Sequence, residues 1–74
     1  MSRNHLDGLE RDIAELWGVY DVLPEGTRDF ILPKVRNRMH RMYEHITDSN
    51  SVQRYVDQLR TYEIHTGVRP WGKE

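Results

Sequence analysis

Apolar residues recur at steps of three and four along most of this chain, and this spacing limits the possible fold more than any other feature. Such steps place side chains on one face of an α-helix, whereas a half-buried strand needs strict alternation. The pattern occurs in three segments and predicts an all-α protein. The three apolar faces are Leu6, Leu9, Ile13, Leu16 and Tyr20; Leu32, Val35, Met39, Met42 and Ile46; and Val52, Tyr55, Val56, Leu59 and Tyr62.

The residues that flank these segments predict where the helices begin and end. Asn4 is a candidate N-cap of the first helix, and Asn50 with Gln53 resembles a capping box for the third. Gly18 is expected to end the first helix. Gly67 is expected to cap the third helix at its C-terminus, because glycine readily adopts the left-handed conformation needed there.

The stretch "DVLPEGT" predicts a turn before the middle segment, after which Thr27 can cap a new helix. Pro33 lies beyond the first turn from Thr27, where a proline removes a hydrogen bond and clashes with the preceding turn. We therefore expect either a short helical turn at 28–32 with a fresh helix from Pro33, or one helix kinked there. Short connections favour antiparallel neighbours, so the predicted fold is a small three-helix bundle with a Pro-kinked or split middle helix and irregular termini.

A chain of 74 residues without cysteine has to hold this bundle together by packing alone. We expect a single domain over residues 1–74, with an ordered core at about 5–66 and an irregular tail at 67–74. No segment has the apolar run of a signal peptide or of a membrane-spanning helix. The expected protein is a soluble, cytoplasmic monomer that does not contact membranes.

The net charge of −1 conceals an uneven distribution of charge along the chain. Residues 7–29 hold seven acidic residues and two Arg, whereas residues 30–46 hold one Lys and three Arg against Glu44. A small dipolar protein of this kind is better suited to a mixed-charge protein surface than to a bulk polyanion.

Four cationic side chains share one face of the middle helix, about a quarter-turn from its apolar face. This basic stripe has two interpretations. It is either the solvated flank of an amphipathic helix, whose long stems cover the edge of the core, or a contact surface for phosphate or an acidic protein patch. An acidic first helix packed alongside would neutralise part of it. The basic stripe consists of Lys34, Arg38, Arg41 and His45.

The C-terminal tail places a large aromatic residue among cations, with Arg69, Pro70, Trp71 and Lys73 in close succession. Trp and Arg are the residue types most enriched at binding hot spots. The alternative is that Trp71 folds back over the bundle as a lid. Arg3 makes the N-terminus a second cationic end of the chain.

Spacing argues against a metal centre in the middle helix. "HRMYEH" is one residue longer than the inverted zinc-protease signature, and His40 and His45 point in different directions. His40 and Glu44 could offer two ligands, but no third is identifiable. The nucleophile and phosphate-binding motifs of common enzymes are missing from the sequence as well. We therefore expect a non-enzymatic protein without metal or cofactor, with Met39 and Met42 as core filler.

A helix-turn-helix is a further hypothesis, because "ITDSNS" could join a positioning helix to a recognition helix. That second helix has no net positive charge and the turn lacks Gly, so a nucleic-acid-binding protein is the alternative rather than the main prediction. Its outward side chains would be Gln53, Arg54, Asp57 and Arg60.

From "MSRNHLDGLERD" through the basic middle segment to "GVRPWGKE", the chain resembles in overall character the small phage-encoded regulators that bind bacterial host RNA polymerase. The resemblance rests on a short, cysteine-free, helical and charge-dense chain, not on a motif. It implies a phage protein in the host cytoplasm that docks on the polymerase β′ subunit near the RNA exit channel. It further implies that the protein inhibits initiation and promotes antitermination.

An inhibitor of a host nuclease-type defence complex would share every one of these sequence features and stays open as a further alternative. Under each protein-binding hypothesis the same side chains are the candidates for the partner contact. They are Arg3, Lys34, Arg38, Arg41, His45, Arg69, Trp71 and Lys73.

Overall fold

Three long helices and one short helix make up the part of the chain that the computed structural model describes, residues 5–71. They are α1 (His5–Val22), α2 (Glu25–Arg28), α3 (Leu32–Glu44) and α4 (Ser49–Thr66). No strand occurs within residues 5–71. The predicted all-α three-helix bundle is therefore confirmed, and its middle segment takes the split form, α2 followed by α3.

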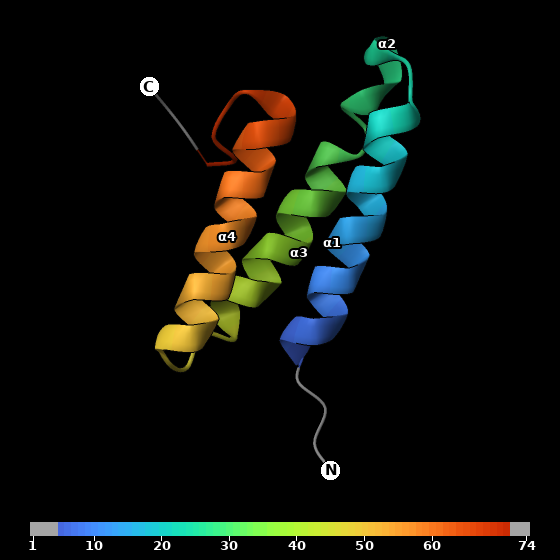
Figure 1. The fold of residues 1–74 in the computed structure, drawn as a ribbon. Coiled ribbons are helices and arrows are strands. Elements are labelled where there is room, and N and C mark those ends of the chain that lie inside the picture. Colours follow the sequence, from blue (N-terminus) through green and yellow to red (C-terminus); the bar gives the residue numbers. More distant parts are fainter. Residues whose placement is uncertain (1–4, 72–74) are drawn as a thin grey trace.

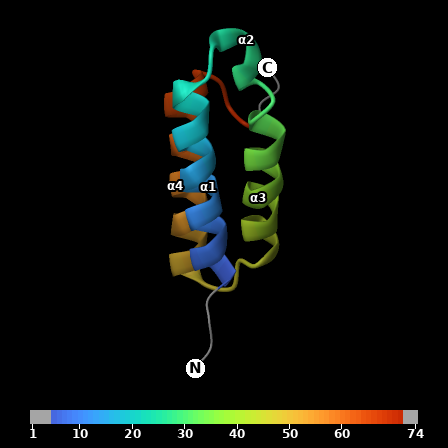
Figure 2. The same cartoon turned by 90° about the vertical axis from the view of Figure 1, so that its right-hand side faces the viewer.

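The long helices alternate in direction, so that α3 runs antiparallel to both α1 and α4 (Figure 1). In the view turned by 90°, α1 and α4 lie on one side of the bundle and α3 lies on the other (Figure 2). Consequently α3 has two flanks, one next to α1 and one next to α4. The two flanks carry different side chains, so candidate binding residues on one flank do not lie next to those on the other.

The core is made mainly by α1 and α3. The predicted apolar face of α3 is confirmed at its centre, where Val35, Met39 and Met42 are fully buried. Trp17 is also buried, although it lies outside the face predicted for α1, because it follows Ile13 by one helical turn. The buried apolar residues are Leu6, Ile13, Trp17, Tyr20, Ile31, Val35, Met39, Met42 and Tyr62.

α4 buries less of its predicted apolar face. Tyr62 is buried, and its hydroxyl accepts a hydrogen bond from Arg36 Nη1 at 2.9 Å. Val52 is 43% exposed, so the prediction that it is buried was wrong. No further helix within residues 5–71 covers the flank of α4 that points away from α1 and α3. Three other residues of the predicted face are only half-buried: Tyr55, Val56 and Leu59.

Two polar contacts join α4 to α1. Near one end, the Arg54 guanidinium donates to both carboxylate oxygens of Glu10, at 2.7 and 2.8 Å, and to Asp7. Near the other end, the His65 ring stacks on Trp17, with ring centroids 4.3 Å apart and 5° between the planes. His65 Nδ1 also lies 3.0 Å from a carboxylate oxygen of Asp21. These contacts fix α4 where apolar burial alone is modest.

α1 does not end at Gly18, contrary to the prediction. The helix continues to Val22, and Gly18 does not adopt the positive φ of a helix-terminating glycine. The Leu23 N–H still donates to the Val19 carbonyl at 3.2 Å, and Pro24 then has no N–H to continue the series. The candidate N-cap Asn4 lies outside the described residues.

α4 begins two residues earlier than Asn50 and Gln53 predicted. Its N-cap is Asp48, whose carboxylate accepts a hydrogen bond from the Ser51 N–H at 2.9 Å. The Ser51 hydroxyl in turn accepts the Asp48 N–H at 3.0 Å, which completes a capping box. At the other end Gly67 has φ +80° and donates its N–H to Glu63 O at 2.7 Å, so this predicted cap is confirmed.

The split between α2 and α3 lies earlier in the chain than expected. α2 begins after Pro24, so Thr27 lies inside the short helix instead of capping it. Hydrogen bonds between residues three apart carry the backbone from Thr27 to Leu32. Pro33 then falls in the first turn of α3, where its missing N–H removes no intrahelical hydrogen bond.

Candidate functional site

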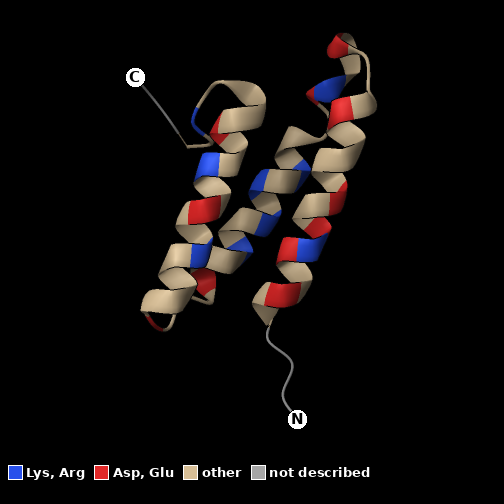
Figure 3. Cartoon of the chain, in the orientation of Figure 1, with Lys and Arg blue, Asp and Glu red and all other residues tan. Residues whose placement is uncertain are grey.

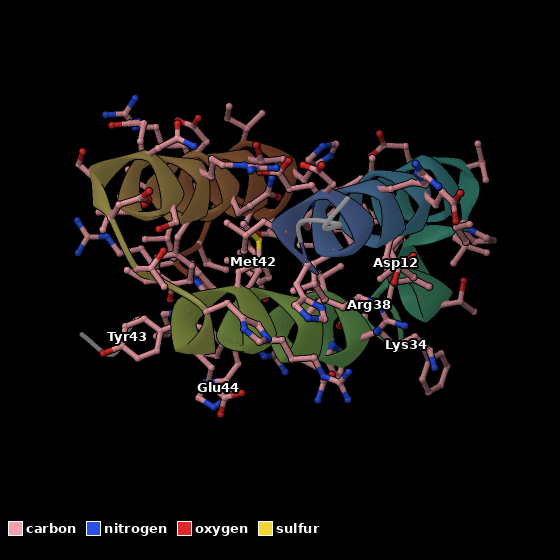
Figure 4. All side chains as sticks on the ribbon, turned by 90° about the horizontal axis from the view of Figure 1, so that it is seen from below. Asp12, Lys34, Arg38, Met42, Tyr43 and Glu44 are labelled. Atoms are coloured by element: carbon pink, nitrogen blue, oxygen red, sulfur yellow. The ribbon has the colours of Figure 1, made fainter. Side chains whose placement is uncertain are left out.

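The basic stripe lies on the flank of α3 that faces α1, beside acidic residues. Figure 3 shows the mostly basic α3 next to the mostly acidic α1. Arg38 Nε lies 3.7 Å from the Asp12 carboxylate, and Figure 4 shows the two side chains pointing toward one another. Arg38 Nη1 also donates to the Lys34 carbonyl at 3.0 Å. The first helix therefore neutralises part of the stripe.

The other members of the stripe differ from one another in their surroundings. The His45 ring stacks on His5 of α1, with centroids 4.9 Å apart. Lys34 and Arg41 are exposed, and their charged groups have no ion-pair partner within residues 5–71. The stripe thus offers a partner two unpaired cations instead of four.

The opposite flank of α3, beside α4, carries an aromatic surface that we define as His40, Tyr43, Tyr55 and Trp71. The ring of Tyr43 lies 6.4 Å from that of His40 and 5.6 Å from that of Tyr55. Trp71 Nε1 donates to the Tyr55 hydroxyl at 2.8 Å. The four side chains line one shallow hollow of about 260 Å³. Tyr43 is 58% exposed, so much of its side chain is accessible to a partner.

Trp71 reaches this surface because the tail turns back along α4 (Figure 1). Gly67 allows the reversal, and the Thr66 hydroxyl accepts the Val68 N–H at 3.1 Å to hold the turn. Arg69 Nε donates to Glu63 at 3.3 Å. Trp71 remains 47% exposed. It folds back over α4, as one interpretation predicted, and its role at a binding hot spot stays a prediction.

A second hollow lies on the other side of Trp71, and we call it the tail groove. It has a volume of about 570 Å³ between α4 and the tail. Arg60 on its rim is exposed, and its guanidinium has no hydrogen-bond or ion-pair partner within residues 5–71. The groove is lined by Val56, Leu59, Arg60, Glu63, Arg69, Pro70 and Trp71.

The candidate partner-binding residues therefore do not form one site. Arg69 and Trp71 lie together beside α4, whereas the basic stripe lies on the opposite flank of α3, next to α1. Arg3 and Lys73 lie outside the described residues. The sequence analysis missed Tyr43 and assigned Tyr55 to the core. Tyr43 lies one step off the apolar face of the middle helix, next to Met42, and that offset is the signal that could have marked it as part of a lateral surface.

The structure corrects the outward surface expected for a helix-turn-helix. Arg54 does not face solvent as a recognition residue, because its guanidinium is bound by Glu10 and Asp7 of α1. The hydrogen bonds that Arg54 donates to Glu10, followed by the one to Asp7, raise the pKa of Arg54 above its ordinary value. Gln53 donates to Asp57 at 3.0 Å. Three of the four side chains expected to point outward, Gln53, Arg54 and Asp57, thus already have partners within the protein.

His40 Nε2 lies 3.3 Å from Glu44, as their spacing allows. In residues 5–71, no cluster of three or more His, Asp or Glu side chains is arranged to hold a metal ion. None of the helices in this part of the chain has the length and apolar character needed to span a membrane.

Comparison of the chain with protein-family models, with curated proteins and with solved structures found no match. The fold and the contacts described above are therefore what bears on function.

Proposed function

We propose that this chain is a non-enzymatic protein that acts by binding another protein through its aromatic surface. The observation that carries the proposal is the position of Trp71, which is half-exposed and held by Tyr55 between two hollows. Binding energy at protein interfaces concentrates in Trp, Tyr and Arg side chains that fill or line pockets. A side chain fixed before binding loses less conformational entropy when the partner arrives.

The partner that we propose to test first is bacterial RNA polymerase. This choice rests on the resemblance of the whole chain to small phage regulators of that enzyme. In this proposal the protein docks on the β′ subunit, inhibits initiation and promotes antitermination. Trp71 and Arg69 are the anchors, while the unpaired cations Lys34 and Arg41 attract acidic polymerase surface over a longer range.

The test is retention of purified bacterial RNA polymerase by the immobilised full-length chain. Trp71→Ala is expected to lower retention at least roughly tenfold, because a Trp anchor at a hot spot is worth about 2 kcal/mol or more. Phe30→Ala is the matched control, since Phe30 is an aromatic residue that is 74% exposed and does not line either hollow.

Three results would count against parts of the proposal. No retention of polymerase by the unmodified chain would exclude this partner. Equal retention by the Trp71→Ala chain would exclude the aromatic surface as the contact. Capture of a nuclease-type defence complex instead, with the same dependence on Trp71, would support the alternative of a defence inhibitor.

Nucleic acid is the second candidate, favoured by two observations on different flanks of α3. The exposed rings of Tyr43 and Trp71 could stack on bases, and Lys34 and Arg41 have no carboxylate partner. Mobility-shift assays with single-stranded and duplex DNA and RNA at rising salt test it, because phosphate contacts weaken steeply as salt rises. No shift at low salt would exclude this class.

A further inference from the structure

The tail groove combines an apolar interior with a charged rim, and this combination restricts what can occupy it. Val56 and Leu59 of α4 are half-buried, while Pro70 and Trp71 belong to the tail. The volume of about 570 Å³ is within the range of roughly 300–1,000 Å³ typical of small-ligand sites. The groove is therefore large enough for a few side chains of a peptide.

Trp71 presents mainly carbon surface to an occupant. Its indole N–H, the one polar group of the side chain, already donates to the Tyr55 hydroxyl. An aliphatic side chain that contacts the exposed ring would thus leave no indole donor unsatisfied. Burial of apolar area against the ring, Val56 and Leu59 would favour such an occupant.

The rim of the groove favours a carboxylate. Arg60 has no partner within residues 5–71, so an incoming anion would bind it without breaking an existing contact. Arg69 is held by Glu63 at 3.3 Å, and the two side chains are 76% and 45% exposed. A guanidinium can donate two parallel hydrogen bonds to a carboxylate, a geometry that a point charge cannot supply.

We infer that the tail groove is the site where the protein binds a short acidic segment of its partner, with an aliphatic side chain on Val56 and Leu59 and a neighbouring carboxylate on Arg60. This inference rests on the proposed function and specifies the chemistry of the partner. A nucleic-acid strand fits the groove less well, because its successive phosphates need several cations along the backbone. Glu63 already pairs with Arg69, which leaves Arg60 as the one cation of the lining without a partner in residues 5–71, enough for a single carboxylate.

The experiment uses the full-length ¹⁵N-labelled chain and follows its amide and indole signals by NMR. The probe is the acetylated peptide Gly-Glu-Leu-Asp-Leu-Glu-Gly-amide. A second peptide replaces Glu and Asp by Gln and Asn, and a third replaces both Leu by Ser. A ten-nucleotide oligothymidine represents a nucleic-acid occupant. We expect saturable shifts at Arg60, Glu63 and the Trp71 indole with the first peptide, and shifts that are much weaker with the second and third.

Arg60→Glu is expected to weaken binding of the first peptide roughly tenfold or more, because it replaces a charge-assisted contact by repulsion. Arg11→Glu is the matched control, since Arg11 is an exposed arginine of α1 that also has no ion-pair partner within residues 5–71. Unchanged helical circular dichroism would show that both variants fold.

Three outcomes would overturn the inference: no shifts at the groove at millimolar peptide, equal shifts with the uncharged peptide, or groove shifts with oligothymidine alone. The polymerase experiment separates this failure from failure of the proposed function. If polymerase retention depends on Trp71 but not on Arg60, the proposed protein-binding function is supported, and the inference that the tail groove binds an acidic segment is rejected. If no protein is retained, the function itself fails.

Discussion

At the scale of single residues, His65 shows how a polar side chain can support a small core. It lies flat on the buried Trp17 ring and within 3.0 Å of an Asp21 oxygen, so it covers an aromatic face that α4 would otherwise leave open. The Trp17 indole N–H is buried and has no hydrogen-bond partner within the described residues. This part of the core therefore depends on ring packing more than on hydrogen bonds.

His65→Ala is expected to destabilise the protein by about 1–2 kcal/mol, because it removes an aromatic stack and a side-chain hydrogen bond together. Urea denaturation at neutral pH measures the change in the free energy of unfolding. His40→Ala is the control, since the His40 side chain is 62% exposed and its loss opens no cavity in the core. Equal effects of the two substitutions would contradict the role given to His65.

Asp48 makes the free energy of unfolding depend on pH in the acid range. The hydrogen bond from the Ser51 N–H, followed by that from its hydroxyl, lowers the pKa of Asp48 below its ordinary value of 3.8. A carboxylate with a lowered pKa stabilises the folded protein above its ordinary pKa, and the contribution is lost as pH falls through the folded pKa. We therefore expect the free energy of unfolding to decline below about pH 4 partly through this group.

Asp48→Asn should make that acid decline shallower, because Asn can still cap α4 but does not titrate. Unfolding by urea across pH 3 to 7 measures the slope. Asp29→Asn serves for comparison, as the Asp29 carboxylate makes no hydrogen bond within residues 5–71. An unchanged slope in the Asp48 variant would show that other carboxyl groups account for the acid sensitivity.

At the scale of helices, α4 depends on contacts with α1 that its own apolar pattern does not reveal. The guanidinium of Arg54 binds two carboxylates from residues 44 and 47 positions earlier in the chain. Helical spacing places Arg54 on a polar face, but it cannot show that a second helix supplies partners there. A residue that looks like solvent-exposed charge in the sequence is a link between helices in the fold.

Arg54→Ala is expected to lower the free energy of unfolding by about 1–3 kcal/mol. It removes the cation that pairs with Glu10 and Asp7, and these two neighbouring carboxylates then repel each other. The loss should be smaller at high salt, which screens the remaining repulsion. Urea denaturation at low and high salt tests both points, with Arg11→Ala as the control. A loss no greater than that of the control would show that the contact contributes little.

The tail and α4 are linked by the hydrogen bond between Trp71 and Tyr55. Tyr55→Phe removes this bond and keeps the ring, so we expect faster hydrogen exchange of the Trp71 indole N–H with little change in global stability. The buried Trp17 indole N–H in the same spectrum is the internal reference. Unchanged exchange at Trp71 would show that the bond does not hold the tail.

Much of the fold could be predicted from the sequence, because apolar spacing reports the faces of helices directly. Helix ends were less predictable, since several residues compete for each cap: Asp48 with Ser51 prevailed over Asn50 with Gln53. The site was the least predictable part. Trp71 was a candidate from its residue type, but the proximity of Tyr43 and Tyr55 depends on how α3 and α4 pack.

At the scale of the whole molecule, the charge asymmetry and the aromatic surface lie on different flanks of α3. Part of the positive charge of α3 is compensated by α1 through Arg38 and Asp12. Lys34 and Arg41 remain unpaired on that side, while Trp71 lies beside α4. This separation assigns long-range attraction and close contact to different residues.

The two sets of residues should accordingly affect different rate constants of partner binding. Lys34→Glu combined with Arg41→Glu is expected to slow association and to reduce its salt dependence, whereas Trp71→Ala should mainly speed dissociation. Surface plasmon resonance at several salt concentrations distinguishes the two effects. If the charge-reversed chain dissociated faster and associated normally, the basic stripe would be part of the close contact.

The different exposure of the two tryptophans gives the protein a pair of internal optical probes. Trp17 is 5% exposed in the core and Trp71 is 47% exposed on the surface. Emission from Trp17 should therefore shift to longer wavelength when the chain unfolds, while emission from Trp71 should shift to shorter wavelength when a partner covers it. Replacing Trp71 by Phe would leave a chain whose fluorescence follows the unfolding of the core, without any attached dye.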